Sequence, residues 1–161
     1  MKVQKFPYDP NKTTVTVAED WVLNNAAEGV ECPCCGQLAK VYRRKLYSSM
    51  AYALITIYGA KGDGEGWLHV PSLLNGKGSV SRGGDFAKLV YWGLLEPHKE
   101  GKGYYRITAR GRDFVECRCA VPAAVFVFDG ELLNHDVEQM VTINEALGTK
   151  FNYEELMEAA R

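Results

Sequence analysis

A helical pattern of apolar residues marks the middle of the chain. In LYSSMAYALITIY (46–58) the apolar positions recur every three or four residues, at Leu46, Met50, Ala53, Leu54 and Ile57. This spacing places them on one face of an α-helix, which we expect to end at Gly59 and the glycine-rich segment 62–66. The next segment, WLHVPSLL (67–74), predicts a short second helix, because Pro71 suits a first helical turn.

A third helix is predicted over SRGGDFAKLVYW (81–92). Ser81 is a suitable N-cap, and Gly93 suits the residue that ends a helix. At 100° per residue, the residues on one face are Phe86, Leu89, Val90 and Gly93. The opposite face, which we expect to be exposed, consists of Gly84, Ala87, Lys88 and Tyr91. Trp92 lies near the edge of that face, and two interpretations stay open: a core aromatic or a residue that stacks on a partner.

Two short segments of alternating character follow the third helix. LLEPH (94–98) and YYRIT (104–108) surround the turn sequence KEGKG and predict a β-hairpin. The expected cross-strand pairs are Leu95 with Ile107, facing inward, and Glu96 with Arg106, facing outward. Thr108 is the expected cap of a closing helix in ARGRDFVE (109–116), so the hairpin joins two helices.

The ends of the chain show weaker patterns. TTVTV (13–17) is β-prone and precedes a short helix expected at 18–27. Near the C-terminus, VPAAVFVF (121–128) followed by Asp-Gly predicts a small hairpin. TINE (142–145) and NYEE (152–155) each predict a helix start, since the first matches a capping box and the second resembles one.

These patterns divide the chain into four segments. Residues 1–30 are expected to form an N-terminal arm, 31–45 a cysteine knuckle and basic loop, 46–117 a domain built from the helices and the hairpin, and 118–161 an acidic C-terminal extension. The extension is a candidate for self-association as a homo-oligomer or for binding a protein partner. Alternatively, it folds back on its own domain.

Composition narrows the class of protein. The 161 residues are 47% hydrophobic and 24% charged, which is typical of a globular chain rather than a disordered one. No apolar run approaches the roughly 18 residues that span a bilayer, and the N-terminus has no apolar signal core, so we expect a cytoplasmic protein without a membrane partner. The sequence has no phosphate loop, HExxH or Gly-x-Ser-x-Gly motif, and we therefore expect no enzymatic activity.

The net charge of −1 conceals a strong asymmetry. Residues 40–112 contain 13 Lys and Arg against 5 Asp and Glu, whereas residues 113–161 contain 3 against 10. A basic centre favours binding to a polyanion, and the alternative is that solvated lysines cluster there without a partner. VYRRK (41–45) has a similar pair of interpretations, as an additional phosphate clamp or as a solvated approach to the first helix.

The predicted order of elements is helix, short helix, helix, hairpin and helix. With the sequences AKLVYWGLLE (87–96), GYYRITARG (103–111) and Phe114-Val115, residues 46–116 resemble the winged-helix (winged helix-turn-helix) family of DNA-binding domains. The resemblance implies an α+β fold, with the third helix in the major groove of DNA and the hairpin on the phosphate backbone or the neighbouring minor groove. The arm, the knuckle loop, and the C-terminal hairpin and helices are then additions to this core.

The resemblance implies a double-stranded DNA-binding protein that acts as a transcription regulator or accessory factor. Glycines at the hairpin tip let the backbone approach DNA, and the lysines there neutralise phosphates. The residues expected to contact DNA are Lys77, Arg82, Gly84, Lys88, Tyr91, Lys99 and Lys102, with Arg43 and Arg44. The alternative is a protein–protein adaptor, because winged helices serve both roles and the third helix carries Lys88 as its clear cation, with Arg82 near its start.

The whole chain also resembles a group of small tailed-bacteriophage proteins. The matching sequences are CPCCGQLAKVYRRKL (32–46), the hairpin region and EALGTKFNYEELM (145–157). This second resemblance implies a phage origin and no particular mechanism.

The five cysteines are better explained as metal ligands or core residues than as disulfides if the compartment is reducing. ECPCCGQ contains Cys-Pro-x-Cys-Gly, a zinc-knuckle sequence whose turn aims the thiolates of Cys32 and Cys35 at one point, with Cys34 as a bystander. A closed structural zinc site needs two further ligands, for which Cys117-x-Cys119 is the available thiolate pair. The alternative is that Cys32 and Cys35 are small half-buried residues without a metal. Redox chemistry is not favoured, since no βαβ pattern surrounds the pair.

Overall fold

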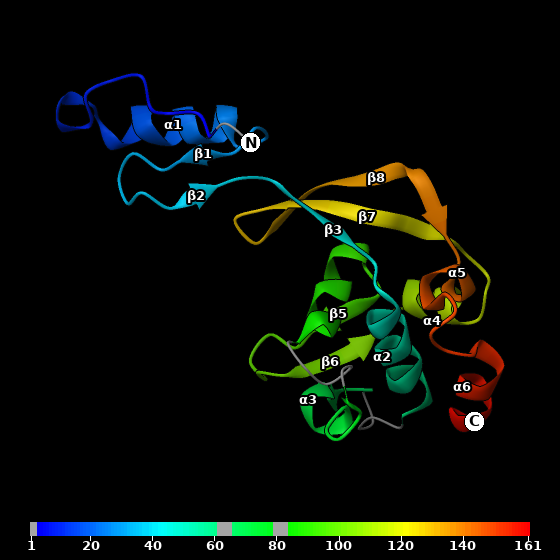
Figure 1. Ribbon diagram of the computed structural model, residues 1–161. Helices are drawn as coiled ribbons and strands as arrows, with labels where there is room; N and C mark the ends of the chain where they lie inside the picture. Colours follow the sequence, from blue (N-terminus) through cyan, green and yellow to red (C-terminus); the bar gives the residue numbers. More distant parts are fainter. Residues whose placement is uncertain (1–2, 61–65, 79–83) are drawn as a thin grey trace. The chain divides into compact units, whose positions relative to one another are not determined.

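The computed structural model describes residues 3–60, 66–78 and 84–161 (Figure 1). The chain combines helices with small sheets of two or three strands, so the expected α+β class is confirmed. The chain divides into two compact units. Unit 1 consists of Met1–Arg44 with Phe126–Asn134, and unit 2 consists of Lys45–Val125 with His135–Arg161.

Unit 1 begins with a short 3-10 helix, η1 (Pro10–Lys12), and the helix α1 (Val15–Asn25). Thr14 caps α1, because its Oγ1 accepts a hydrogen bond from the Val17 N–H at 3.4 Å. The β-prone sequence 13–17 therefore starts a helix rather than a strand, which corrects the expectation. The cap satisfies an N–H at the helix start, and this outweighs the slightly lower helix propensity of β-branched residues.

Two short strands of unit 1, β1 (Val30–Glu31) and β2 (Leu38–Ala39), pair antiparallel. The cysteine-bearing segment 32–37 forms the turn between them. β3 (Tyr42–Lys45) follows β2, so the basic part of the predicted loop is a strand.

The strand β3 belongs to a three-stranded sheet with β7 (Val121–Phe128) and β8 (Glu131–Val141), in the order β3-β7-β8. The turn from β7 to β8 contains Asp129 with φ of 48° and Gly130 with φ of 76°. Two successive positive φ values are what a type I′ hairpin turn requires. The hairpin predicted from the Asp-Gly sequence is confirmed, and its second strand is longer than expected.

The first predicted helix is α2 (Ser48–Gly59), the central element of unit 2. Its side chains Met50, Leu54 and Ile57 are buried, as the helical spacing predicted. Figure 1 shows three later helices of unit 2 packed against α2: α4 (Ala109–Val115), α5 (Ile143–Leu147) and α6 (Tyr153–Ala159).

The second predicted helix is the single turn α3 (Val70–Leu73), with Pro71 in its first turn. A strand that the sequence did not reveal, β4 (Leu68–His69), precedes it. β4 pairs with β6 (Tyr104–Ile107), which also pairs with β5 (Leu95–Pro97), so the sheet has the order β4-β6-β5. A two-residue strand has no measurable period, and only its pairing partner identifies it.

The third predicted helix is a 3-10 helix, η3 (Asp85–Trp92), rather than an α-helix. A 3-10 helix has three residues per turn, so residues i and i+3 lie in line along it. Phe86, Leu89 and Trp92 therefore form one ridge, and all three are buried. The face drawn at 100° per residue was right for Phe86 and Leu89. It was wrong for Gly93, which is exposed, and for Trp92, which is buried, while Val90 is half-buried.

The structure decides between the two interpretations of Trp92. Its side chain is 1% exposed, and its Nε1 donates a hydrogen bond to the Pro122 carbonyl at 2.7 Å. Trp92 is therefore a core residue, and the interpretation that it stacks on a partner was wrong. Ser81, the predicted N-cap, lies outside the described residues, and Gly84, with φ of 63°, directly precedes η3.

The predicted β5–β6 hairpin is confirmed together with its register. Leu95 lies opposite Ile107, and Glu96 lies opposite Arg106. Leu95 is buried, whereas Arg106 Nε donates a hydrogen bond to Glu96 Oε2 at 2.8 Å on the outer face of the sheet.

The helix α4 begins at the predicted cap. Thr108 Oγ1 accepts a hydrogen bond from the Gly111 N–H at 3.0 Å and donates one to the Gly93 carbonyl at 2.6 Å. Gly111 permits a close approach, since a Cβ built there would lie 2.3 Å from the Leu94 carbonyl oxygen. These contacts fix α4 against the end of η3.

Both predicted C-terminal caps are present. Thr142 and Glu145 form a reciprocal capping box at the start of α5. At the start of α6, Asn152 Oδ1 accepts a hydrogen bond from the Glu155 N–H at 3.2 Å.

The helix α6 docks on α2. A Cβ built on Gly59 would lie 2.6 Å from the Ala160 Cβ, so the two backbones meet at close range. The Tyr153 hydroxyl donates a hydrogen bond to the Val115 carbonyl at 2.8 Å. Of the alternatives for the tail, folding back on its own domain is the one observed for this helix.

Candidate nucleic-acid interface and cysteine turn

The turn between β5 and β6 is held by a histidine side chain. His98 Nδ1 accepts hydrogen bonds from the backbone N–H groups of Glu100 at 3.2 Å and Gly101 at 2.8 Å. Both lysines of the turn, Lys99 and Lys102, are exposed. The two lysines were predicted from the sequence, whereas the role of His98 was not. A histidine just after a strand and three residues before a glycine was the available signal.

Aromatic rings cover the outer face of the β4-β6-β5 sheet. The ring centroids are 4.7 Å apart for Trp67 and His98, 6.5 Å for His98 and Tyr104, and 5.1 Å for Tyr104 and His69. Gly103 leaves room for this packing, because a Cβ there would lie 2.8 Å from His69 Nε2. Tyr104 is exposed, so the cluster presents an aromatic surface beside the two turn lysines.

Arg106 is held within this face. Its guanidinium carbon lies 4.5 Å from the Trp67 ring centroid, and its Nε bonds to Glu96. The hydrogen bond from Arg106 lowers the pKa of the Glu96 carboxyl. The guanidinium is thereby oriented by two neighbours of its own chain.

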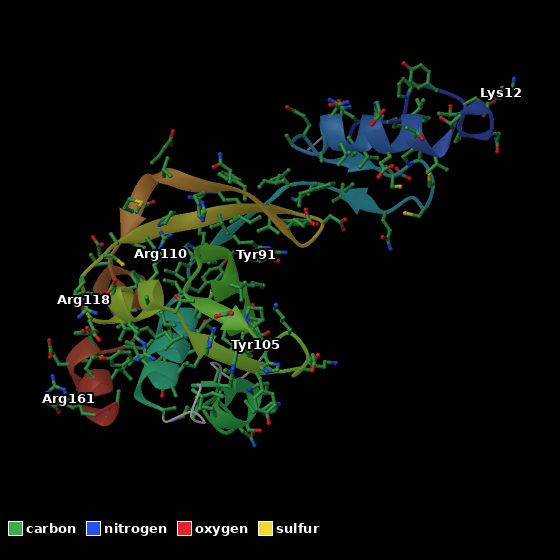
Figure 2. All side chains as sticks on the ribbon, turned by 180° about the vertical axis from the view of Figure 1, so that it is seen from behind. Lys12, Tyr91, Tyr105, Arg110, Arg118 and Arg161 are labelled. Carbon is green, nitrogen blue, oxygen red and sulfur yellow. The ribbon has the colours of Figure 1, made fainter. Side chains whose placement is uncertain are left out.

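The inner face of the hairpin contacts η3. The rings of Phe86 and Tyr105 meet edge to face, with centroids 5.3 Å apart and planes at 88°. The buried ridge of η3 and the inner face of β6 therefore set the position of the hairpin relative to the third helix. Figure 2 shows Tyr105 and Arg161 on opposite sides of unit 2, which separates the hairpin from α6.

Lys88 is engaged by its own helix. Its Nζ lies 2.6 Å from Asp85 Oδ1, three residues earlier, where the three-residue turn brings the two side chains into line. Tyr91 is the next residue on this ridge and is half-buried. The ridge opposite the core thus carries an internal ion pair and a tyrosine, not the unpaired cation that the sequence suggested.

The remaining predicted DNA contacts are spread over the chain. Lys77 is exposed after α3, and Gly84 precedes η3, whereas Arg82 lies outside the described residues. Arg43 and Arg44 lie on β3 in unit 1, where the Arg44 guanidinium carbon is 4.8 Å from the Tyr42 ring centroid. Within unit 2, the structure brings the predicted residues of η3 and the turn lysines into one hairpin–helix assembly.

In unit 1, the cysteine turn is tightly hydrogen-bonded. The Cys32 N–H donates to the Gln37 carbonyl at 2.8 Å, and the Gly36 N–H donates to the Cys32 carbonyl at 2.8 Å. Gly36 has a positive φ of 72°, which folds the chain back. The backbone N–H groups of Cys34 and Cys35 bond to the Cys32 sulfur and lower the pKa of the Cys32 thiol.

The second cysteine pair has a different environment. Cys117, with φ of 60°, accepts a hydrogen bond from Asn144 Nδ2 at 3.6 Å. The Cys119 thiol lies 3.9 Å from the Arg110 carbonyl oxygen, and burial raises its pKa. Both residues belong to unit 2. Residues 3–60, 66–78 and 84–161 contain no group of three or more His, Cys, Asp or Glu side chains placed to hold a metal ion.

An apolar groove of about 550 Å³ adjoins the cysteine turn in unit 1. α1 lines it with Val15 and Leu23, β2 with Leu38, and the turn with Cys32 and Cys35. Val15, Leu23 and Leu38 are exposed despite their apolar side chains.

Comparison with protein-family models, with curated proteins and with solved structures found no match to the chain. In the part of the chain that the structure describes, no helix has the length and apolar character needed to cross a membrane.

Proposed function

We propose that unit 2 is a winged-helix domain that binds double-stranded DNA, in a phage regulator or accessory factor. The observation that supports this most is the arrangement around η3: a helix, a short helix, η3, and then a hairpin fixed to η3 by the Phe86–Tyr105 contact. That order is the one implied by the winged-helix resemblance. In the proposed complex, η3 faces the major groove and the β5–β6 turn lies on the phosphate backbone.

The turn is suited to a phosphate contact. His98 holds its backbone, and Lys99 and Lys102 project from it as exposed cations. Neutralised phosphates release condensed counterions, so the affinity falls with salt by about 0.9 log units per log unit of salt for each phosphate. The lysines then contribute affinity without reading sequence.

Binding through η3 is expected to have little sequence preference. The side chains on its ridge are Asp85, Lys88 and Tyr91, and the lysine is already paired with the aspartate. Arg, Asn and Gln, which read base edges with paired hydrogen bonds, are missing from the sequence of η3. A DNA phosphate must also displace Asp85 to bind Lys88, which reduces the gain from that contact.

A protein-interaction role is the second candidate, and the aromatic outer face of the β4-β6-β5 sheet favours it. Tyr104 is exposed there, next to Trp67 and His98. Tyrosine and tryptophan are enriched in the binding surfaces of proteins. An adaptor would use this face and require no contribution from the turn lysines.

A salt titration of binding to a random-sequence duplex tests the proposal. The full chain, with a labelled duplex, is expected to bind at about 50 mM salt and micromolar protein, and to lose affinity steeply towards about 200 mM. The double variant Lys99→Ala/Lys102→Ala is expected to weaken binding to all sequences alike and to lower the salt slope by up to about two units.

A matched control has the same change of charge at positions outside the hairpin. Lys12→Ala/Lys150→Ala removes two exposed lysines, one from unit 1 and one from the segment before α6. It is expected to retain the salt slope. Equal losses in both double variants would indicate a general charge effect and reject the turn as the phosphate contact. If no binding is detected at low salt, the adaptor role becomes the better explanation.

A further inference from the structure

The hydrophobic core of unit 1 is too small to stabilise the unit by itself. Its buried apolar side chains, among the residues described, are alanines and valines: Ala18, Ala26, Val30 and Val127. Other apolar side chains remain outside, with Val15 73% and Leu23 57% exposed. Units of this size usually need a metal, a disulfide or a partner to remain folded.

The cysteine turn has the construction of one half of a metal site. Cys32 and Cys35 stand at the two sides of a turn closed by the Cys32–Gln37 and Gly36–Cys32 backbone hydrogen bonds. Amide N–H groups of the turn already point at the Cys32 sulfur. Structural zinc sites are built from such pairs of closely spaced cysteines.

Unit 1 supplies too few ligands to close this site. The other cysteine of unit 1 is Cys34, the bystander within the turn, whereas Cys117, Cys119 and the three histidines, at 69, 98 and 135, belong to unit 2. Structural zinc sites use four Cys or His ligands, so two thiolates leave half of the tetrahedron unfilled. Cys117 and Cys119 make hydrogen bonds inside unit 2, with Asn144 and the Arg110 carbonyl.

We propose that Cys32 and Cys35 bind a zinc ion together with the same two residues of a second copy of the chain. Two turns related by a twofold axis supply four thiolates, the tetrahedral set that zinc prefers. Each bound thiol loses its proton to solvent. Lys40, which lines the same groove, reduces the excess negative charge of a four-thiolate site.

The groove beside the turn supports a second copy as the occupant. Val15, Leu23 and Leu38 border the turn with exposed apolar surface, and an isologous contact covers the same patch on both chains. The inference does not depend on DNA binding by unit 2. If both hold, each dimer carries two DNA-binding units, and binding to a long duplex gains from their linkage.

Metal content and mass in solution test the proposal on the full-length, reduced protein. Protein loaded with zinc and freed of excess metal is expected to contain one zinc per two chains by elemental analysis and to have the mass of a dimer by light scattering. A chelator is expected to remove the zinc and yield monomers. Cobalt substituted for zinc is expected to show the absorption of a tetrahedral four-thiolate site.

The cysteines provide matched variants. Cys35→Ser is expected to abolish metal-dependent dimers, whereas Cys34→Ser, the neighbouring change, is expected to retain them. Cys117→Ser/Cys119→Ser is expected to retain both the zinc and the dimer. Should Cys35→Ser fail to fold, mixing tagged and untagged wild-type chains gives a second measurement, with zinc-dependent and chelator-sensitive co-purification expected.

Three results would overturn the proposal. One zinc per chain, lost in Cys117→Ser/Cys119→Ser, would identify a four-cysteine site within a single chain. A zinc-loaded protein with the mass of a monomer would exclude the shared site. No retention of zinc or cobalt by reduced protein would leave the segment 32–37 as a hydrogen-bonded turn without a metal.

Discussion

The two units of this chain are stabilised in different ways. Unit 2 buries large side chains, among them Trp92, Phe114, Met50 and Leu54, around α2. The described part of unit 1 buries alanines and valines and leaves Leu23 exposed. The core of unit 2 is therefore built from large side chains, whereas the buried residues in the described part of unit 1 are small.

The two units also differ in how their polar groups are hydrogen-bonded. In unit 2 the buried indole of Trp92 has a carbonyl partner, and among the described residues no buried side-chain N or O atom lacks a hydrogen bond. In unit 1 the cysteine turn is closed by two backbone hydrogen bonds of 2.8 Å. We therefore expect a mutation in the core to destabilise mainly unit 2, and removal of the proposed zinc to destabilise mainly unit 1.

Chelation should give the largest difference between the units. Removing the proposed zinc is expected to abolish amide protection in α1, β1 and β2, because the binding energy of structural zinc, about 10–16 kcal/mol in zinc-finger peptides, is folding energy. Protection in α2 is expected to remain. Hydrogen exchange measured with and without chelator tests this. An equal loss of amide protection in both units would show that the units do not differ in their dependence on metal.

Truncation of a core side chain should instead destabilise unit 2 and leave unit 1 unaffected. Phe114→Ala is expected to destabilise unit 2 by about 3–5 kcal/mol, because the side chain is fully buried. The control Leu133→Ala removes an exposed side chain of unit 1 that does not line the groove, and it is expected to cost less than about 0.5 kcal/mol. Denaturant unfolding monitored by tryptophan fluorescence measures both changes. A large effect of Leu133→Ala would show that Leu133 is covered in solution.

Alkaline pH should release one helix of unit 2. Burial, with a hydrogen bond to Cys117, raises the pKa of Tyr153 to about 12. A raised folded-state pKa stabilises the fold fully below the unfolded value of about 10, and this contribution is lost as the pH rises towards 12. Tyr153→Phe is expected to remove that dependence and to cost about 0.5–1.5 kcal/mol through the lost hydrogen bond to Val115. Hydrogen exchange in α6, or melting at several pH values, measures it; an identical alkaline profile in the variant would assign the effect to another group.

Acid pH should have the smallest effect. Hydrogen bonds from the Thr142 N–H and hydroxyl lower the pKa of Glu145. A lowered folded-state pKa stabilises above the unfolded value of about 4.3, and the contribution disappears as the pH falls below that value. Glu145→Gln is expected to flatten this part of the pH profile. Thermal melts between pH 3 and 7 measure it, and a slope unchanged by the variant would contradict the assignment.

The sequence predicted most of unit 2, because most elements there have a recognisable period or a recognisable cap. Spacing of three and four residues located α2, and alternation fixed the register of Leu95 with Ile107. The Thr108 cap located α4. These features depend on local chemistry that the tertiary structure reinforced.

The predictions that failed also have physical explanations. β4 is too short to have a period, and the 3-10 geometry of η3 moved the buried ridge to Trp92. The Lys88–Asp85 pair joins residues three apart, a spacing that both 3-10 and α-helices bring together, and it was not predicted. DNA binding and zinc binding depend on partners outside the chain, and both stay predictions.

The contact between Gly59 and Ala160 has a consequence for how this protein can change during evolution. Even a methyl group at position 59 would meet the backbone and side chain of residue 160 at 2.6 Å. The two positions, a hundred residues apart in the chain, therefore constrain each other. We expect related sequences to keep glycine at the first position wherever the C-terminal helix is retained, and to accept larger residues there only when that helix is lost or displaced.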